Sequence, residues 1–127
     1  MNFETCKISE GKIVIAYSDE NFSLGFLEVN PDSEFKKHNR PCVETLYQIK
    51  GNATMLLFDE DGNREEIALS EGEELEISAG KYHIHSNRTA EPCIQMWKAK
   101  GDIRDILNNI RKASKRSRTR TFRTLTH

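Results

Sequence analysis

The sequence lacks any long hydrophobic run. Of its 127 residues, 36% are hydrophobic and 31% are charged, and no apolar stretch approaches the roughly 20 residues that a membrane-spanning helix needs. Residues 1–17 also lack the basic, apolar and small-residue succession of a secretory signal, and they carry acids at Glu4 and Glu10. We therefore expect one domain without a membrane partner, located in the cytoplasm.

Cysteine is scarce as well. The three cysteines, Cys6, Cys42 and Cys93, are odd in number, lie far apart and form no Cys-x-x-Cys pair. This pattern excludes a disulfide framework and a thiolate zinc site. We expect three reduced thiols.

Acidic residues are missing from the C-terminal end. Residues 1–97 hold 9 Lys+Arg and 18 Asp+Glu, whereas residues 98–127 hold 10 Lys+Arg and 2 Asp+Glu, so the net charge of -1 hides two unlike parts. A segregated basic tail raises the question of a nucleic-acid partner. Because the basic residues of this tail are spread among Ser and Thr, without the aromatic interleaving suited to stacking on bases, we expect no specific nucleic-acid binding. Salt-sensitive attraction to polyanions or to an acidic protein surface is the alternative.

Short strand-like segments fill the middle of the chain and are separated by turn signals. They cover residues 12–17, 22–29, 45–50, 53–58, 65–69, 74–78, 82–86 and 93–98. Strands at this spacing, joined by tight turns, predict an all-β antiparallel sandwich or barrel. The Asp61-Gly62 dipeptide predicts a two-residue hairpin loop of type I′.

A helical pattern follows Gly101. Asp102 is a suitable N-cap, and the next apolar residues recur at i, i+3, i+4 and i+7: Ile103, Ile106, Leu107 and Ile110. We expect a β-domain over residues 1–101 and an amphipathic helix over residues 102–112 that packs on it. Residues 113–127 have little to bury, so we expect a basic, disordered tail.

Three of the four histidines lie in two short stretches. An extended chain would place His38 and Glu44 about 20 Å apart, but Arg40-Pro41 between them breaks the strand. His38 would then end one strand and Glu44 begin the next, pointing back across the barrel. His83 and His85 are two residues apart and face the same side of a strand. Imidazole and carboxylate are good ligands for Fe, Mn, Ni, Zn and Cu.

Together the two stretches resemble the two motifs of the cupin superfamily. His38-x-Arg40-x3-Glu44-x6-Gly51 is similar to the first motif, and Gly72-x5-Ser78-x-Gly80-x2-His83-x3-Asn87 is similar to the second. With the flanking strands, the chain resembles a small single-domain cupin (cupin type-2 conserved barrel) over roughly residues 10 to 100. The resemblance implies an antiparallel double-stranded β-helix, or jelly-roll, and a homodimer. It implies no single reaction, because that superfamily hosts many activities.

Residue by residue, the resemblance makes His38, Glu44 and His83 the ligands of one divalent transition metal. The chain departs from the first motif at its opening glycine, which is Asp32, and at its second histidine, which is Arg40. A guanidinium is always protonated and cannot bind a metal. Either the three residues form a two-His-one-carboxylate face, or His85 enters as a fourth donor.

The role of Arg40 stays open at this point. It is either a contact for a substrate anion, since its planar fork suits carboxylate or phosphate, or the partner of Glu44 in a metal-free barrel. Gln48 and Tyr82 are further candidates for lining the pocket, although aromatic residues on alternating strands also pack cores.

We thus expect a cupin that acts on, or binds, a small anionic molecule at a metal centre. As an enzyme it would be metal-dependent, dioxygenase-like or isomerase-like, with the ion as Lewis acid or O2 activator. The alternative is a non-catalytic ligand-binding or sensor cupin, with or without metal.

Overall fold

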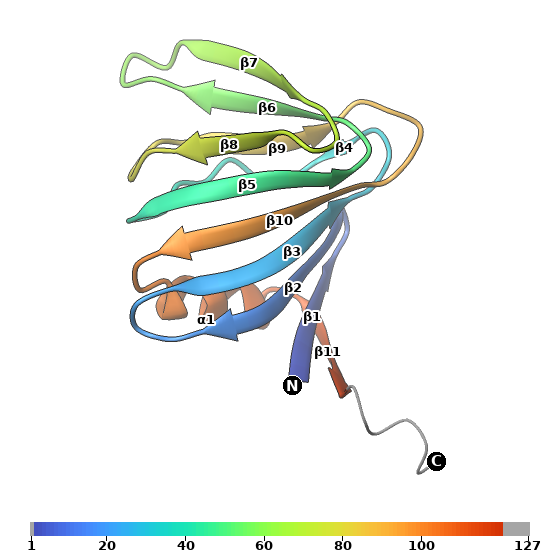
Figure 1. Ribbon diagram of the computed structural model, residues 1–127, viewed down its shortest axis with the longest axis vertical. Coiled ribbons are helices and arrows are strands. Elements are labelled where there is room, and N and C mark those ends of the chain that lie inside the picture. The colour runs from blue at the N-terminus through green and yellow to red at the C-terminus, as the bar shows by residue number, and fades with distance from the viewer. Residues whose placement is uncertain (1, 121–127) are drawn as a thin grey trace.

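A computed structural model describes residues 2–120 and consists of two antiparallel sheets and one helix (Figure 1). The larger sheet has the strand order β11-β1-β2-β3-β10-β5-β8, and the smaller one has the order β4-β9-β6-β7. The strands are β1 (Asn2–Ile8), β2 (Gly11–Ser18), β3 (Ser23–Val29), β4 (Ser33–Glu34), β5 (Val43–Lys50), β6 (Ala53–Phe58), β7 (Arg64–Leu69), β8 (Glu74–Ile77), β9 (His83–Asn87), β10 (Cys93–Lys100) and β11 (Lys115–Arg120). The predicted all-β jelly roll with one C-terminal helix is confirmed.

The core lies between the two sheets and follows the period-2 alternation of their strands. In β3 and β10 every second residue is buried. Trp97 is one of these inward residues, and its indole Nε1 donates a hydrogen bond to the Phe26 carbonyl (3.1 Å). A Cβ atom on Gly25 would lie 2.4 Å from the Trp97 ring and 2.0 Å from the Val14 carbonyl oxygen. Glycine is therefore required where this ring crosses the neighbouring strand.

The turn between β6 and β7 differs from the predicted two-residue loop. Phe58 pairs with Arg64, and the backbone N–H of Asp59 donates to the carbonyl of Asn63 (3.0 Å). A type I′ turn would need positive φ at both Asp61 and Gly62, but only Gly62 has it (83°). The prediction was wrong because the Asp59 carboxylate accepts the backbone N–H groups of Asp61 and Asn63, which stabilises a wider loop.

The turn before β4 explains one departure from the first motif. Asp32 stands in place of the motif's glycine, and it is the one described non-glycine residue with positive φ (52°). Aspartate tolerates this left-handed conformation better than most residues. The substitution therefore keeps the turn that leads the chain toward His38.

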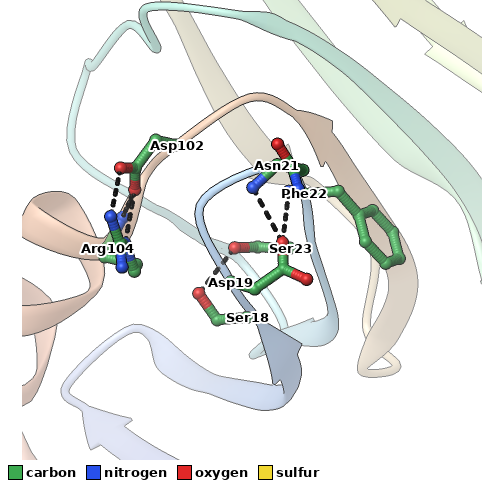
Figure 2. A network of polar contacts seen from close by, with 7 residues as sticks. All are labelled: Ser18, Asp19, Asn21, Phe22, Ser23, Asp102 and Arg104. Atoms are coloured by element: carbon green, nitrogen blue, oxygen red, sulfur yellow. Dashed lines mark hydrogen bonds and ion pairs between the residues drawn. The ribbon is translucent and has the colours of Figure 1, made fainter.

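Helix α1 (Arg104–Lys112) covers one end of the space between the sheets. Ile103 occupies the N-cap position, while the Asp102 carboxylate accepts the backbone N–H of Arg104 and pairs with its guanidinium (Figure 2). Figure 2 also shows the nearby β2–β3 turn, which is held by the Asp19 carboxylate. The buried side of the helix packs on the core through Ile103 and Leu107.

The helix is also tied to the first strand. The guanidinium of Arg111 donates two hydrogen bonds to the Glu4 carboxylate (2.8 and 2.9 Å). Two parallel bonds of this kind fix orientation as well as adding stability. Within residues 2–120, helix α1 is neither long nor apolar enough to cross a membrane.

The chain beyond the helix corrects part of the predicted disordered tail. Lys115–Arg120 forms β11 and pairs antiparallel with β1, from Asn2↔Arg120 to Lys7↔Lys115. Backbone hydrogen bonds to a free strand edge need no apolar side chains, so composition does not reveal them. Residues 121–127 of the predicted tail lie outside the described residues. The three cysteines are free thiols.

Candidate metal centre

Four candidate ligands, from two strands and the segment before β5, meet between the sheets. His83 and His85 point inward from β9, and Glu44 points inward from β5 after the turn over residues 39–42. His38 is held beside β9, because its backbone N–H donates to the His83 carbonyl (3.0 Å) and its carbonyl accepts from the His83 N–H (2.8 Å). One ligating atom from each of the four residues lies within 4.8 Å of the other three.

The cluster is buried and leaves polar atoms without partners. Glu44 is 5% exposed, His83 1% and His85 2%. His38 Nε2, Glu44 Oε1 and His83 Nε2 make no hydrogen bond. His83 Nε2 lies 3.2 Å from Glu44 Oε1, but without hydrogen-bond alignment. An unpaired buried polar group costs about 1–3 kcal/mol, so three on neighbouring residues call for a ligand between them.

The histidine tautomers are set by hydrogen bonds on the far side of each ring. In every case Nδ1 faces an oxygen acceptor, and therefore carries the proton, so that Nε2 keeps a lone pair. The acceptors are the Lys36 carbonyl for His38 (2.8 Å), the Lys81 carbonyl for His83 (2.9 Å) and Oε1 of Gln95 for His85 (2.9 Å). All three lone pairs are thus available for one ion.

A chain of buried amides orients His85. Gln48 Nε2 donates to the Lys50 and Gly51 carbonyls (3.1 and 3.2 Å), which leaves Gln48 Oε1 to accept from Gln95 Nε2 (2.9 Å). Gln95 Oε1 is then the acceptor for His85. Gln48 was a candidate for lining the pocket. In the structure it orients His85 indirectly, through its hydrogen bond to Gln95. Gln95 was missed, although it is the one polar side chain on the inward face of β10, where the pattern could have revealed it.

Replacing Gln95 with methionine is expected to weaken metal binding by about 10–100-fold, as for lost partners of metal-bound histidines. The side chain keeps its volume, but His85 Nδ1 loses its acceptor. Metal titration and histidine 15N spectra of the metal-free variant measure the effect. Ile94→Met, on the outward side of the same strand, serves as the control. Unchanged metal affinity together with an unchanged His85 tautomer would contradict the role of the amide chain.

Burial and charge set the protonation state that a metal requires. Burial, helped by the charge of Arg40, lowers the pKa of His38 to about 3, and burial places the pKa of His85 well below its ordinary value. Burial alone would raise the pKa of Glu44, but the adjacent His83 and Arg40 outweigh it and hold the pKa below its usual range. At neutral pH the two histidines are neutral and the carboxylate is ionised, as ligands must be.

Arg40 lies beside the cluster without joining it. Its Nη1 donates to the Asn39 carbonyl (3.1 Å), and among the described residues no ion pair links it to Glu44. Burial lowers the pKa of Arg40 while Glu44 raises it, and a guanidinium stays charged at neutral pH. The arrangement in which Arg40 pairs with Glu44 is therefore not found.

Replacing Arg40 with histidine is expected to tighten metal binding at least about tenfold, or about 1.4 kcal/mol, because a positive charge near the ion is removed. Calorimetric metal titration measures the change. Arg88→His, which removes an exposed arginine paired with Glu66, serves as the control. Equal affinity of Arg40→His and wild type would show that Arg40 has no electrostatic effect on the ion.

Tyr82 lies outside the cluster. Its side chain is 48% exposed and lines a separate surface groove with Phe58 and Lys37. The Lys37 ammonium sits over both rings, 4.1 Å from the Phe58 centroid and 5.5 Å from that of Tyr82. The structure thus brings together His38, Glu44, His83 and His85, places Arg40 next to them, and leaves Tyr82 at the surface.

Solved structures share this architecture. No family model and no curated protein matches the sequence. Oxalate decarboxylase from Bacillus subtilis, in a structure at pH 4.6, is 24% identical with a TM-score of 0.71, covering 77% of this chain and 27% of that one. The formate complex of Lactobacillus farciminis oxalate decarboxylase is 22% identical with a TM-score of 0.71, and the match covers 78% of this chain and 31% of that one. Vicilin from hazelnut, Corylus avellana, is 25% identical with a TM-score of 0.70, and the match covers 78% of this chain and 31% of that one. The chain spans less than a third of each, and the Bacillus enzyme has Mn(II) centres.

Proposed function

Since this chain has the cupin fold, we propose that His38, Glu44, His83 and His85 bind one divalent transition metal. The protein then acts on, or binds, a small anionic molecule at that centre. The observation that carries the proposal is the set of three buried atoms without hydrogen-bond partners, on His38, Glu44 and His83. These atoms converge from separate segments of the chain, and no packing role accounts for them.

The donor set suits the proposed ion. Three imidazole nitrogens and one carboxylate oxygen are ligands for Fe, Mn, Ni, Zn or Cu. When bound, such an ion supplies Lewis acidity or an O2-binding position. The chain's own residues hold the ligand atoms in place and exclude water: Phe35 packs edge-on against His85, with ring centroids 5.9 Å apart, and Met55 is fully buried. Arg40 supplies a fixed positive charge for an anion.

A binding or sensing role is the second candidate, favoured by the position of α1. The helix forms one wall of the cavity next to the cluster, and Arg111 links it to β1 through Glu4. A ligand in the cavity would touch the segment that leads into the C-terminal strand. Ligand binding and the position of that segment would then be coupled.

Incubation of metal-loaded protein with single carboxylates, followed by proton NMR, distinguishes the two roles. Consumption of a carboxylate, abolished in His83→Ala, supports an enzyme. A saturable rise in melting temperature without consumption supports a binding module. Neither response with any of the five metals would contradict the proposal.

The chain is also proposed to form a homodimer through the outer face of its larger sheet. Four apolar side chains lie directly opposite one another across four strands of that face: Val14, Phe26, Met96 and Tyr47. Next to them, Glu74 and Glu76 mark the β8 side, while Lys7 and Lys12 mark the β1–β2 side. A two-fold axis parallel to the strands would bring the acidic β8 edge of one copy over the basic β1–β2 edge of the other.

Sedimentation of the purified protein at micromolar concentration is expected to show a dimer. Met96→Glu should shift it to a monomer of unchanged fold, because it puts a charge at the centre of the apolar row. Ile84→Glu, on the outer face of the other sheet, is the control and should remain dimeric. A wild-type monomer at all concentrations would refute this interface.

A further inference from the structure

A cavity leads from the surface to the candidate metal centre beneath helix α1. Its outer part has a volume of about 360 Å3 and reaches His38, and its inner part, about 30 Å3, reaches Glu44. The two parts share four lining residues: Ile13, Phe35, Arg40 and Ile110. They therefore adjoin each other at these residues, and the outer volume lies at the small end of the range of about 300–1,000 Å3 for ligand pockets.

The lining combines apolar walls with the guanidinium of Arg40, and the charged residues Glu10 and Lys36 also line the outer part. Ile13 and Phe35 form one side, and Ile110 of α1 forms the other. Deeper in, Trp97 and Leu107 continue the apolar surface. Arg40 lies where the two parts join, and the one hydrogen bond from its guanidinium goes to a neighbouring carbonyl. A ligand that fits has an apolar body and an anionic head.

Once a metal binds, the charges of the site favour a ligand with an anionic group. Glu44 and Arg40 both line the inner part of the cavity and carry opposite charges, so they balance in the metal-free protein. A divalent ion adds two positive charges that no other buried acid of the cluster offsets. Uncompensated charge in a buried site is costly, so an anion completes the site.

We propose that this cavity binds a small amphiphilic monocarboxylate, with its carboxylate beside Arg40 and its alkyl or aryl body between Phe35 and Ile110. The inference rests on the proposed metal centre. Metal and carboxylate bind cooperatively, each raising the affinity of the other by the same factor. A carboxylate is favoured over a phosphate because its two oxygens match the planar fork of one guanidinium, whereas a phosphate has a third oxygen that this fork does not pair.

The test is calorimetric titration of hexanoate into metal-loaded and metal-free protein. Acetate is the probe without an apolar body, hexanamide the probe without a charge, and hexylphosphonate the probe with the other acid group. Hexanoate is expected to bind the metal-loaded protein at least about tenfold more tightly than each of the other three. It should bind the metal-free protein at least about tenfold more weakly, with an equal reciprocal gain in metal affinity.

Two variants separate the head from the body. Arg40→Gln should weaken hexanoate binding about 10–100-fold while the metal still binds. Ile110→Trp should fill the cavity and abolish the preference for hexanoate over acetate, whereas Ile49→Trp, on an exposed side chain, should not. Circular dichroism confirms that each variant folds.

The outcomes distinguish the inferred carboxylate binding from the proposed metal-binding function on which it rests. Absence of metal binding contradicts the proposed function itself. Metal binding with equal affinities for hexanoate, acetate and hexanamide overturns the inference alone, as does an unchanged hexanoate affinity in Arg40→Gln. Tighter binding of hexylphosphonate than hexanoate overturns the choice of a carboxylate.

Discussion

Replacing His83 with alanine is expected to lower metal affinity by more than about 100-fold, beyond the effect of losing an outer partner. His83 is nearly fully buried, and its Nε2 lies 3.2 Å from Glu44 Oε1. Its backbone also pairs with that of His38, and this pairing survives the substitution. The variant thus loses one donor while the other ligands keep their positions. Calorimetric titration with each of the five metals measures the loss.

The matched control is Ile84→Ala. Ile84 follows His83 on β9 and points to the opposite face of the sheet. Its truncation is expected to reduce stability without changing metal affinity. Wild-type metal affinity in His83→Ala would remove this residue from the ligand set.

The metal-free protein is expected to lose stability as the pH falls from about 6.5 toward 3. His38 and His85 have depressed pKa values in the folded state because they are buried, whereas an unfolded chain protonates histidine near pH 6.5. Between these pH values the unfolded state binds more protons than the folded state, so the free energy of unfolding decreases as the pH decreases. The slope is about 1.4 kcal/mol per pH unit for each histidine, or about 2.7 for both. A domain near the lower end of the ordinary range of about 5–15 kcal/mol would unfold on this path.

Urea unfolding of the metal-free protein at several pH values between 7.5 and 4 measures this slope. His85→Gln should reduce it by about half, because one of the two histidines is gone. Bound metal should raise stability near neutrality and make the loss on acidification steeper, since protons compete for the ligands. A free energy of unfolding that stays constant between pH 6.5 and 4 would contradict the neutral buried histidines.

Local patterns predicted most of the strands, but they missed β1, β4 and β11 and one turn. The eight predicted segments correspond to β2, β3 and β5 to β10, because each is rich in aliphatic or aromatic residues and is bounded by turn signals. Strand β11 was missed because only its pairing with β1 orders it, and that pairing joins the two ends of the described chain. The Asp61-Gly62 loop was mispredicted because the side chain of Asp59, outside the dipeptide, decides its length.

The candidate site shows the same division. The chain break at Arg40-Pro41 predicted that His38 and Glu44 lie close together, and the resemblance to the cupin motifs implied that His83 joins them. Whether His85 joins them depends on how closely the two sheets approach. Only the three-dimensional structure shows that its ligating atom lies within 4.8 Å of those of the other three residues. Arg40 lines a cavity together with helix α1, which begins 64 residues further along the chain, so local pattern could not place them side by side.

Metal content tests the central claim most directly. Protein purified without a histidine tag, loaded and then freed of excess metal, is expected to hold about one transition-metal ion per chain and to melt at a higher temperature than the metal-free form. Inductively coupled plasma mass spectrometry and a thermal melt measure the two quantities. Clearly substoichiometric content of every transition metal, with no gain in melting temperature on adding Fe, Mn, Ni, Zn or Cu, would contradict the account.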